Sequence, residues 1–244
     1  MTKVKKIISI NQNIDSFKKN IISVDGDKSI SIRFILLSSL SSGKCVATNL
    51  LKSEDVISAI KSIKKLGIKI KLKNKSCEVT GRGLHGYKFK NKLILNAGNS
   101  GTTARLICSV LVNSPKWVKI TGDESLKKRD MERIIKPLKL FGVKFKNKNK
   151  KLPILIKGTK FLSPIQYNEK LGSAQCKSAV MIAALKTKGK TKLKCLPSRD
   201  HTERMFKNVL KVPIRTIKKK NYDIIEIDGL NEFKPFNYKI PGDI

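Results

Sequence analysis

Residues 97–105 read Ala97-Gly98-Asn99-Ser100-Gly101-Thr102-Thr103-Ala104-Arg105, and an apolar run follows from Leu106 to Val112. Glycine, asparagine and serine favour turns and helix caps, whereas the apolar run suits a buried helix. The stretch therefore predicts a turn that opens directly into a helix, with small polar residues at the helix start.

Two other stretches share this layout. They are Asp25-Gly26-Asp27-Lys28-Ser29-Ile30-Ser31-Ile32-Arg33, before an apolar run to Leu40, and Leu171-Gly172-Ser173-Ala174-Gln175-Cys176-Lys177, before an apolar run to Leu185. A second matched segment follows each of the three, with aspartates at positions 55, 130 and 200 that lie 75 and 70 residues apart. Recurrence at such a spacing indicates three internal repeats of about the same length.

Each repeat is expected to alternate strands and helices. Residues 56–66 carry apolar side chains at helical spacing, with Asp55 near the start and Gly67 as a C-cap. Residues 68–72 alternate between apolar residues and lysine, as a half-buried strand does. Further strands are predicted at 93–95, 118–120, 154–156 and 224–227. The pattern predicts an α/β (α+β) body of three pseudo-symmetric βαβαβ(β) repeats, with helices inside and sheets outside.

The chain has 244 residues and is strongly basic, with a formal net charge of +35. Such a charge suits a nucleic-acid-binding protein, which we keep as an alternative. Only eight of the 53 basic residues are arginine, however, and the lysines are scattered through polar segments with few aromatic residues between them. This pattern is typical of a solvated surface, and small anionic substrates fit the charge equally well.

Several other classes of protein are excluded. No apolar run reaches the roughly 18 residues of a membrane span, and the first apolar stretch is too short for a signal peptide. The five cysteines form no Cys-x-x-Cys pair and are odd in number, so neither a zinc site nor a full disulfide framework is expected. We therefore expect a cytoplasmic protein with reduced core thiols. Trp117 is expected in the core or in a strand, and His85 and His201 in structural or substrate-side roles.

The predicted helix starts are candidate anion sites. A helix N-terminus presents free backbone N–H groups and the positive end of the helix dipole. Lys28 adds a mobile cation, Ser29 a hydroxyl donor, and Arg33 lies about one turn further on. Gly101 gives an anion access to the backbone, with Arg105 on the first turn. A plain cap is the better interpretation of any one start alone, but the recurrence favours a shared anion site.

Five motifs occur in order along the chain. They are Lys28-Ser29-x-x-x-Arg33, Leu95-Asn96-Ala97-Gly98-Asn99-Ser100-Gly101-Thr102, Gly122-Asp123-x-Ser125-Leu126-x-Lys128-Arg129, Ser173-Ala174-Gln175-x-Lys177-Ser178-Ala179 and Ser198-Arg199-Asp200-His201-Thr202-Glu203. Together they resemble the signatures of the 5-enolpyruvylshikimate-3-phosphate (EPSP) synthase family. The resemblance implies one domain of the enolpyruvyl transferase fold, an inside-out α/β barrel. It also implies transfer of the enolpyruvyl group of phosphoenolpyruvate to the 5-hydroxyl of shikimate 3-phosphate, in the pathway to aromatic amino acids.

The resemblance further implies roles for individual residues. Lys28 would lie between the two substrates and stabilise charge in the transition state. Shikimate 3-phosphate would be bound by Lys28, Ser29, Arg33, Ser173, Ala174, Gln175, Ser198 and Arg199. Phosphoenolpyruvate would be bound by Lys28, Asn99, Gly101, Arg129 and Gln175. No metal and no cofactor is required, and Gly101 would leave room for the inhibitor glyphosate.

Two positions depart from the family pattern. Ser125 stands where some members carry an arginine for phosphoenolpyruvate, and Asp130 replaces the usual proline, where we expect it to act as a helix N-cap.

Members of the family have two domains, whereas this chain resembles the first. We expect residues 1–20 to belong to the hinge or second domain, residues 21–240 to form the three-repeat substrate-binding domain, and residues 241–244 to begin a crossover to a missing second domain. The chain is then expected to be inactive alone. We expect it to occur as a monomer or paired with a separate C-terminal half.

Three rival interpretations stay open. The related transferase that acts on a UDP-amino sugar carries a different lysine-asparagine signature and a reactive cysteine in a glycine-rich loop, neither of which occurs here. A basic nucleic-acid-binding protein predicts affinity for any polyanion that falls steeply with salt. A non-catalytic fragment predicts binding of shikimate 3-phosphate at best.

Overall fold

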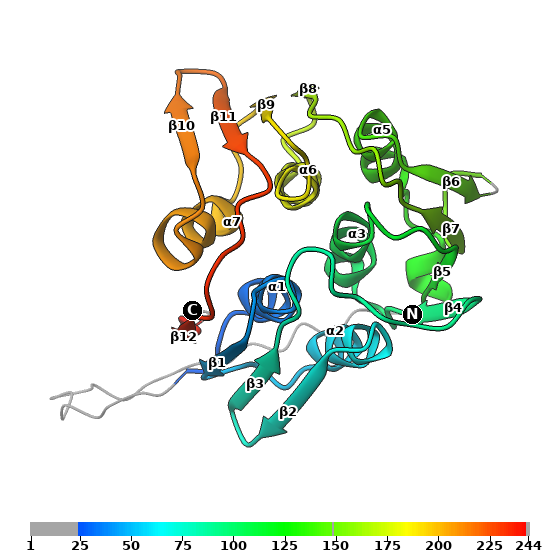
Figure 1. Ribbon diagram of the computed structural model, residues 1–244, viewed down its shortest axis with the longest axis vertical. Coiled ribbons are helices and arrows are strands. Elements are labelled where there is room, and N and C mark those ends of the chain that lie inside the picture. The colour runs from blue at the N-terminus through cyan, green and yellow to red at the C-terminus, as the bar shows by residue number, and fades with distance from the viewer. Residues whose placement is uncertain (1–23, 148, 243–244) are drawn as a thin grey trace, which may run out of the picture.

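The architecture comes from a computed structural model that describes residues 24–147 and 149–242. The expected hinge segment, residues 1–20, lies outside this part, as do residues 243 and 244 of the expected crossover. Three four-stranded sheets surround a group of central helices (Figure 1). The predicted α/β body with helices inside and sheets outside is confirmed.

The second repeat shows the unit in full. Its elements are β4 (Leu93–Asn96), α3 (Gly101–Val110), β5 (Val118–Thr121), α4 (Glu124–Lys127), α5 (Glu132–Leu140), β6 (Lys144–Asn147) and β7 (Ile154–Lys157). The strands form a sheet in the order β4-β5-β7-β6. Strands β4 and β5 run parallel, and the other two pairs are antiparallel.

The third repeat follows the same plan. Its elements are β8 (Gln166–Glu169), α6 (Ala174–Ala184), β9 (Lys190–Cys195), α7 (His201–Arg204), a stretch of π-helix η1 (Met205–Leu210), β10 (Ile214–Lys218) and β11 (Asp223–Asp228). The sheet order is β8-β9-β11-β10, again with one parallel pair at the edge.

The first repeat takes one of its strands from the far end of the chain. It consists of α1 (Lys28–Ser38), β1 (Lys44–Thr48), α2 (Glu54–Lys65), β2 (Lys69–Lys73) and β3 (Ser76–Thr80). The sheet order is β12-β1-β3-β2, and β12 (Asn237–Lys239) pairs parallel with β1. Strand β12 thus takes the place that β4 and β8 hold in the other sheets. The sequence pattern predicted no strand at 237–239.

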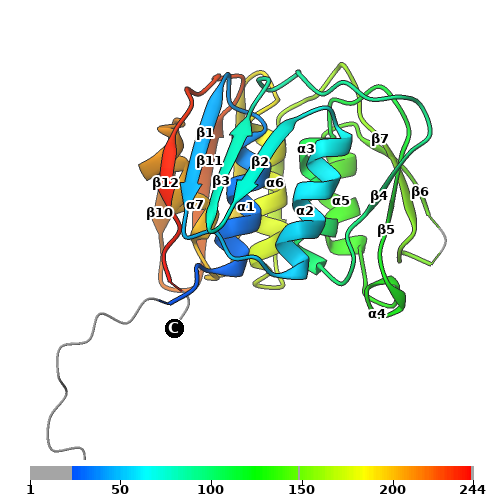
Figure 2. The ribbon, with the colours of Figure 1, turned by 90° about the horizontal axis from the view of Figure 1, so that it is seen from below.

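Helices α1, α3 and α6 form the centre of the molecule and lie side by side in Figure 2. Almost every side chain from the second turn of each helix onward is buried. A helix that is apolar on all sides is expected where neighbours cover it completely. Phe34, Phe141 and Phe206 are fully buried in this core, and each such side chain stabilises the fold by roughly 1.5–3 kcal/mol.

Helix α2 and the strands behave as their patterns predict. On α2, Val56, Ile60 and Ile63 are buried while its lysines face solvent. Gly67 follows the C-cap with φ of +88°, a left-handed conformation that glycine adopts without strain. The predicted strands at 93–95, 118–120, 154–156 and 224–227 are all present.

The expected core positions of the cysteines are confirmed, and the expected position of Trp117 in the core or in a strand is wrong. All five cysteines are buried and free. Burial raises the pKa of Cys77, Cys108 and Cys176 to about 12, so these groups stay thiols at neutral pH.

Trp117 lies just before β5 and is half-buried at the outer surface, because the inward positions of β5 are taken by Val118 and Ile120.

Among residues 24–147 and 149–242, no helix is both long enough and apolar enough to cross a membrane. No cluster of three or more histidine, cysteine or acidic side chains suited to a metal ion occurs in the same described part.

Candidate functional site

The three central helices begin in the same way. Their N-caps are Asp27, Ser100 and Ser173. Each cap side chain accepts a hydrogen bond from the third residue of its helix, at 2.6 Å from Ile30 N, 3.2 Å from Thr103 N and 3.3 Å from Cys176 N. This is the geometry of a helix N-cap. The predicted helix starts are therefore confirmed, and each keeps further backbone N–H groups for other partners.

Three of the residues predicted for phosphoenolpyruvate, Asn99, Gly101 and Arg129, meet at the start of α3. Arg129 Nη2 donates to Asn99 Oδ1 at 3.0 Å, and Asn99 Nδ2 donates to Asp123 Oδ2 at 2.6 Å. The Leu126 N–H and the Asn99 amide both donate to Asp123 and hold the pKa of its carboxyl below the ordinary value. These bonds fix the orientation of Asn99 and Arg129 at the helix start.

Gly101 lies directly against two guanidinium groups. A methyl group added at its Cα would lie 3.0 Å from Arg105 Nη1 and 3.2 Å from Arg129 Nη1. The absence of a side chain at Gly101 therefore lets two cations approach the first N–H groups of α3. An anion at this point would meet a helix N-terminus and two arginines together.

Arg105 lies beside Gly101 together with Arg129, although the sequence motifs assign it to no substrate. Its Nη1 donates to Gln175 Oε1 at 2.6 Å, and Gln175 Nε2 donates to Thr102 Oγ1 at 3.0 Å. These two bonds join the starts of α3 and α6. Burial and then the neighbouring Arg133 and Arg129 lower the pKa of Arg105. Like charges held this close are relieved when an anion binds between them.

Arg33 ties α1 to α6 and α7. Its guanidinium donates to Thr202 Oγ1 at 2.8 Å, Ser178 Oγ at 2.9 Å and the Ser29 carbonyl at 3.0 Å. The residue is only 3% exposed, and burial lowers its pKa to about 10, so it stays charged at neutral pH. Three of the five N–H groups of Arg33 thus donate hydrogen bonds to protein atoms.

The segment that carries Ser198 and Arg199 is held by a buried lysine. Lys177 Nζ lies 2.6 Å from Glu203 Oε1 and donates to the Ser198 carbonyl at 3.2 Å. The Ser198 hydroxyl is buried without a hydrogen-bond partner within the described residues, and Arg199 is exposed. The exposed Arg199 therefore keeps its donors for an external group.

Lys28 is the first residue of α1, and its side chain lies at the solvent-exposed edge of the residues described above. Its Nζ is 3.2 Å from Asp55 Oδ2, and its side chain is 49% exposed. The backbone carbonyl of Asp55 accepts from Thr103 Oγ1 at 3.4 Å, which links this corner to the start of α3.

The predicted residues thus gather at the starts of α1, α3, α6 and α7. Arg129 bonds Asn99, Arg105 bonds Gln175, and both arginines lie beside Gly101. Lys177 on α6 bonds the Ser198 carbonyl. No recorded bond within the described residues links Lys28 directly to Gln175 or Arg129. Arg105, Lys177 and Glu203 were missed as site residues, although Lys177 and Glu203 fall within the quoted motifs and Arg105 on the predicted first turn.

Asp130 and the two histidines have local roles. Asp130 Oδ1 accepts a hydrogen bond from the Glu132 N–H at 3.0 Å. The N-cap of α5 is Met131, so Asp130 lies one residue before the position predicted for it. His85 Nδ1 lies 2.7 Å from Asn113 Nδ2. His201 is the first residue of α7, and burial and then Arg33 lower its pKa.

Three equivalent four-stranded sheets around buried central helices define a domain of the enolpyruvyl transferase fold. The family model of EPSP synthase (3-phosphoshikimate 1-carboxyvinyltransferase) matches residues 13–244. The chain belongs to the EPSP synthase family.

Individual relatives agree with this assignment. The chain is 40% identical over 225 residues to the 3-phosphoshikimate 1-carboxyvinyltransferase of Ruthia magnifica, which covers 91% of this chain and 50% of that protein. It is 39% identical over 231 residues to the enzyme of that name from Thermoanaerobacter sp. (strain X514), covering 93% and 52%. The EPSP synthase structure from Acinetobacter baumannii matches with a TM-score of 0.82 and 34% identity, over 91% of this chain and 49% of that one. The chain spans about half the length of these relatives.

Proposed function

We propose that this chain forms one half of a 3-phosphoshikimate 1-carboxyvinyltransferase, a soluble enzyme of the cytoplasm that transfers the enolpyruvyl group of phosphoenolpyruvate to shikimate 3-phosphate. The observation that carries this proposal is the cluster at Gly101, where Arg105 and Arg129 flank an open helix start and Arg105 holds Gln175. A cluster of this kind suits an anion that has both a phosphate and a carboxylate.

The reaction explains the need for cations. The 5-hydroxyl oxygen of shikimate 3-phosphate bonds to the central carbon of phosphoenolpyruvate while the methylene carbon takes up a proton. The hydroxyl loses its proton in this addition, and the methylene carbon becomes a methyl group. The carbon–oxygen bond to phosphate then breaks while the methyl group loses a proton, which restores the carbon–carbon double bond and releases phosphate. Two phosphates and two carboxylates share the site, so pre-oriented cations and helix dipoles are the main source of stabilisation.

The predicted residues keep their roles in this proposal, and Gln175 contacts both substrates. Lys28 acts at the junction of the two substrates. Ser29, Arg33, Ser173, Ala174, Gln175, Ser198 and Arg199 bind shikimate 3-phosphate, and Asn99, Gly101, Arg129 and Gln175 bind phosphoenolpyruvate. The support is their convergence at four helix starts. We further propose that residues 21–240 are the substrate-binding domain, that residues 1–20 and 241–244 lead to a second domain, and that the acid/base carboxylate lies there, so the chain does not turn over alone.

Calorimetric titration with shikimate 3-phosphate tests the proposal. The chain should bind this ligand more tightly than inorganic phosphate at moderate salt. Lys28→Ala should weaken binding by roughly tenfold, because it removes a charge-assisted contact worth about 1.4 kcal/mol. The matched control is Lys69→Ala, on the exposed outer strand β2, and it should leave binding unchanged.

Two outcomes would contradict the proposal. Equal affinity for shikimate 3-phosphate and phosphate, when tested together with the C-terminal half of a relative, would remove the specific site. Tighter binding of an oligonucleotide, with a steep fall in affinity as salt rises, would favour the nucleic-acid alternative.

A further inference from the structure

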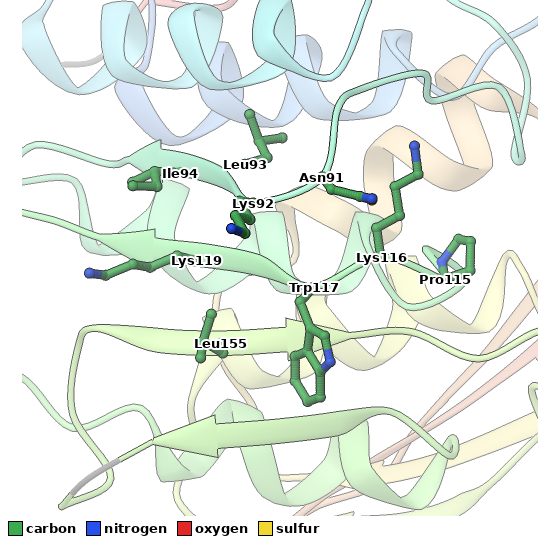
Figure 3. A pocket seen from close by; sticks show the side chains of 9 residues that line it. All are labelled: Asn91, Lys92, Leu93, Ile94, Pro115, Lys116, Trp117, Lys119 and Leu155. Carbon is green, nitrogen blue, oxygen red and sulfur yellow. The ribbon is translucent and has the colours of Figure 1, made fainter.

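The outer face of the second sheet carries an apolar hollow far from the helix starts described above. The hollow has a volume of about 450 Å³, and Leu93, Ile94, Trp117 and Leu155 form its apolar wall (Figure 3). A second hollow of about 450 Å³ continues it towards β6 and shares Lys119 and Leu155. Ile94 and Leu155 are 48% and 36% exposed on this face.

The other two sheets of the same chain provide an internal comparison. In the third sheet Lys192 faces Glu226 across the strand pair, and their charged groups lie 3.7 Å apart. In the first sheet the equivalent strand carries Glu78, which pairs with Lys44 at 2.7 Å. In the second sheet Lys119 faces Leu155 instead. The second sheet therefore has leucine where the other two have glutamate.

The lysines around this face lack acidic partners. None of Lys92, Lys119 and Lys146 forms an ion pair with any described residue. Lys146 Nζ instead lies 5.0 Å from the centre of the Trp117 ring. The face thus combines an exposed apolar centre with uncompensated positive charge, a combination that complements an apolar group flanked by carboxylates.

We propose that this face docks an acidic segment of a partner protein, with an apolar side chain of the segment in the hollow and its carboxylates on Lys92, Lys119 and Lys146. A second copy of the chain fits poorly, because two molecules of charge +35 repel each other. A nucleic acid fits poorly as well, since aliphatic side chains line the hollow and lysine covers its single aromatic ring.

Fluorescence anisotropy with the full chain tests this surface. The probe is a labelled peptide in which glutamates flank one phenylalanine and one leucine, used at about 150 mM salt to screen long-range attraction. Replacing both apolar residues of the peptide by serine should weaken binding about tenfold, and the double variant Ile94→Ser and Leu155→Ser should do the same. Lys119→Glu should weaken binding roughly fivefold, whereas Lys69→Glu, the same charge change on the first sheet, should have no effect.

Three results would overturn the proposal. Equal binding of the serine peptide, or equal loss in Lys119→Glu and Lys69→Glu, would show general attraction of negative charge. Full competition by an oligothymidylate would show a nucleic-acid surface. A dimer of the wild type in sedimentation, together with a monomer of the Ile94→Ser and Leu155→Ser double variant, would show that this face contacts another copy of the chain.

Discussion

The ammonium group of Lys177 lies 2.6 Å from the carboxylate of Glu203, and Lys177 is 1% exposed. The pair joins α6 to α7 and also holds the Ser198 carbonyl. Because both charges are removed from water, each depends on the other for its stability.

Removal of one member of this pair should be costly. We expect Glu203→Gln to lower the free energy of unfolding by about 3–5 kcal/mol, because it leaves a buried ammonium without its counter-ion. Urea denaturation measures this change. The double variant Lys177→Met and Glu203→Gln should recover much of the loss, and a double variant as unstable as the single one would contradict an ion-pair origin.

The guanidinium geometry of Arg33 should also be irreplaceable. Lysine at this position keeps a charge but cannot reach Thr202, Ser178 and the Ser29 carbonyl together. We expect Arg33→Lys to destabilise the chain by about 2 kcal/mol, measured by urea denaturation. The exposed Arg199→Lys serves as control and should change stability by less than about 0.5 kcal/mol.

Gly101→Ala should separate binding from stability. The new methyl group meets the ends of two flexible arginine side chains and no backbone atom at close range, so the fold should lose no more than about 1 kcal/mol. The guanidinium groups must shift, however, and affinity for phosphoenolpyruvate should fall roughly fivefold by calorimetry. Unchanged affinity would show that Arg105 and Arg129 do not bind this ligand.

The three helix caps allow a test of the repeat itself. Asp27→Ala, Ser100→Ala and Ser173→Ala each remove one side-chain bond to the helix start. Each should cost about 1 kcal/mol in urea denaturation. A loss confined to one of the three would show that the caps are equivalent only in geometry.

Stability should rise with pH because of Lys186. Its amine donates to the Val110 carbonyl at 2.6 Å and Asn113 Oδ1 at 2.9 Å, and burial lowers its pKa to about 7. In the unfolded chain a lysine amine has a pKa near 10.4, so above pH 7 the unfolded state binds more protons than the folded state. The penalty of burying a charged amine is thus full below about pH 7 and declines as the pH rises.

Urea denaturation of the wild type and of Lys186→Met between pH 7 and about 8.2 measures this effect, because the ionisation of unfolded thiols contributes equally to both proteins. The wild-type slope should exceed that of Lys186→Met by about 1 kcal/mol per pH unit. Equal slopes in the two proteins would show that the amine is not desolvated in the folded state.

Local patterns predicted most of the elements and the residues at the helix starts. The predicted strand at 68–72 follows from the alternation of apolar residues with lysine, and the starts of α3 and α6 follow from the small polar residues before them. Both patterns depend on near neighbours in the sequence. The motifs gave Asn99 and Gly101 because both lie at the start of α3. Arg129 belongs to a separate motif, and its bond to Asn99 depends on the fold.

Features that depend on distant contacts could not be predicted. Nothing near Lys177 or Lys186 in the sequence marks them as buried, because their partners come from other repeats or loops. The bond from Arg105 to Gln175 spans 70 residues, and the pairing of β12 with β1 spans most of the chain. Trp117 was assigned by its apolar character alone, which does not tell the two faces of a sheet apart.

The pairing of β12 with β1 also sets an order of events during synthesis. Val46 pairs with Asn237, the Asp27 N–H donates to the Pro241 carbonyl at 2.8 Å, and Gly26 and Gly242 form a β-bridge. When the first two repeats have emerged from the ribosome, β12, the strand that completes the first sheet, has not yet been synthesised. The edge of β1 stays open until the end of the domain emerges, so an unpaired strand is exposed while most of this domain is translated.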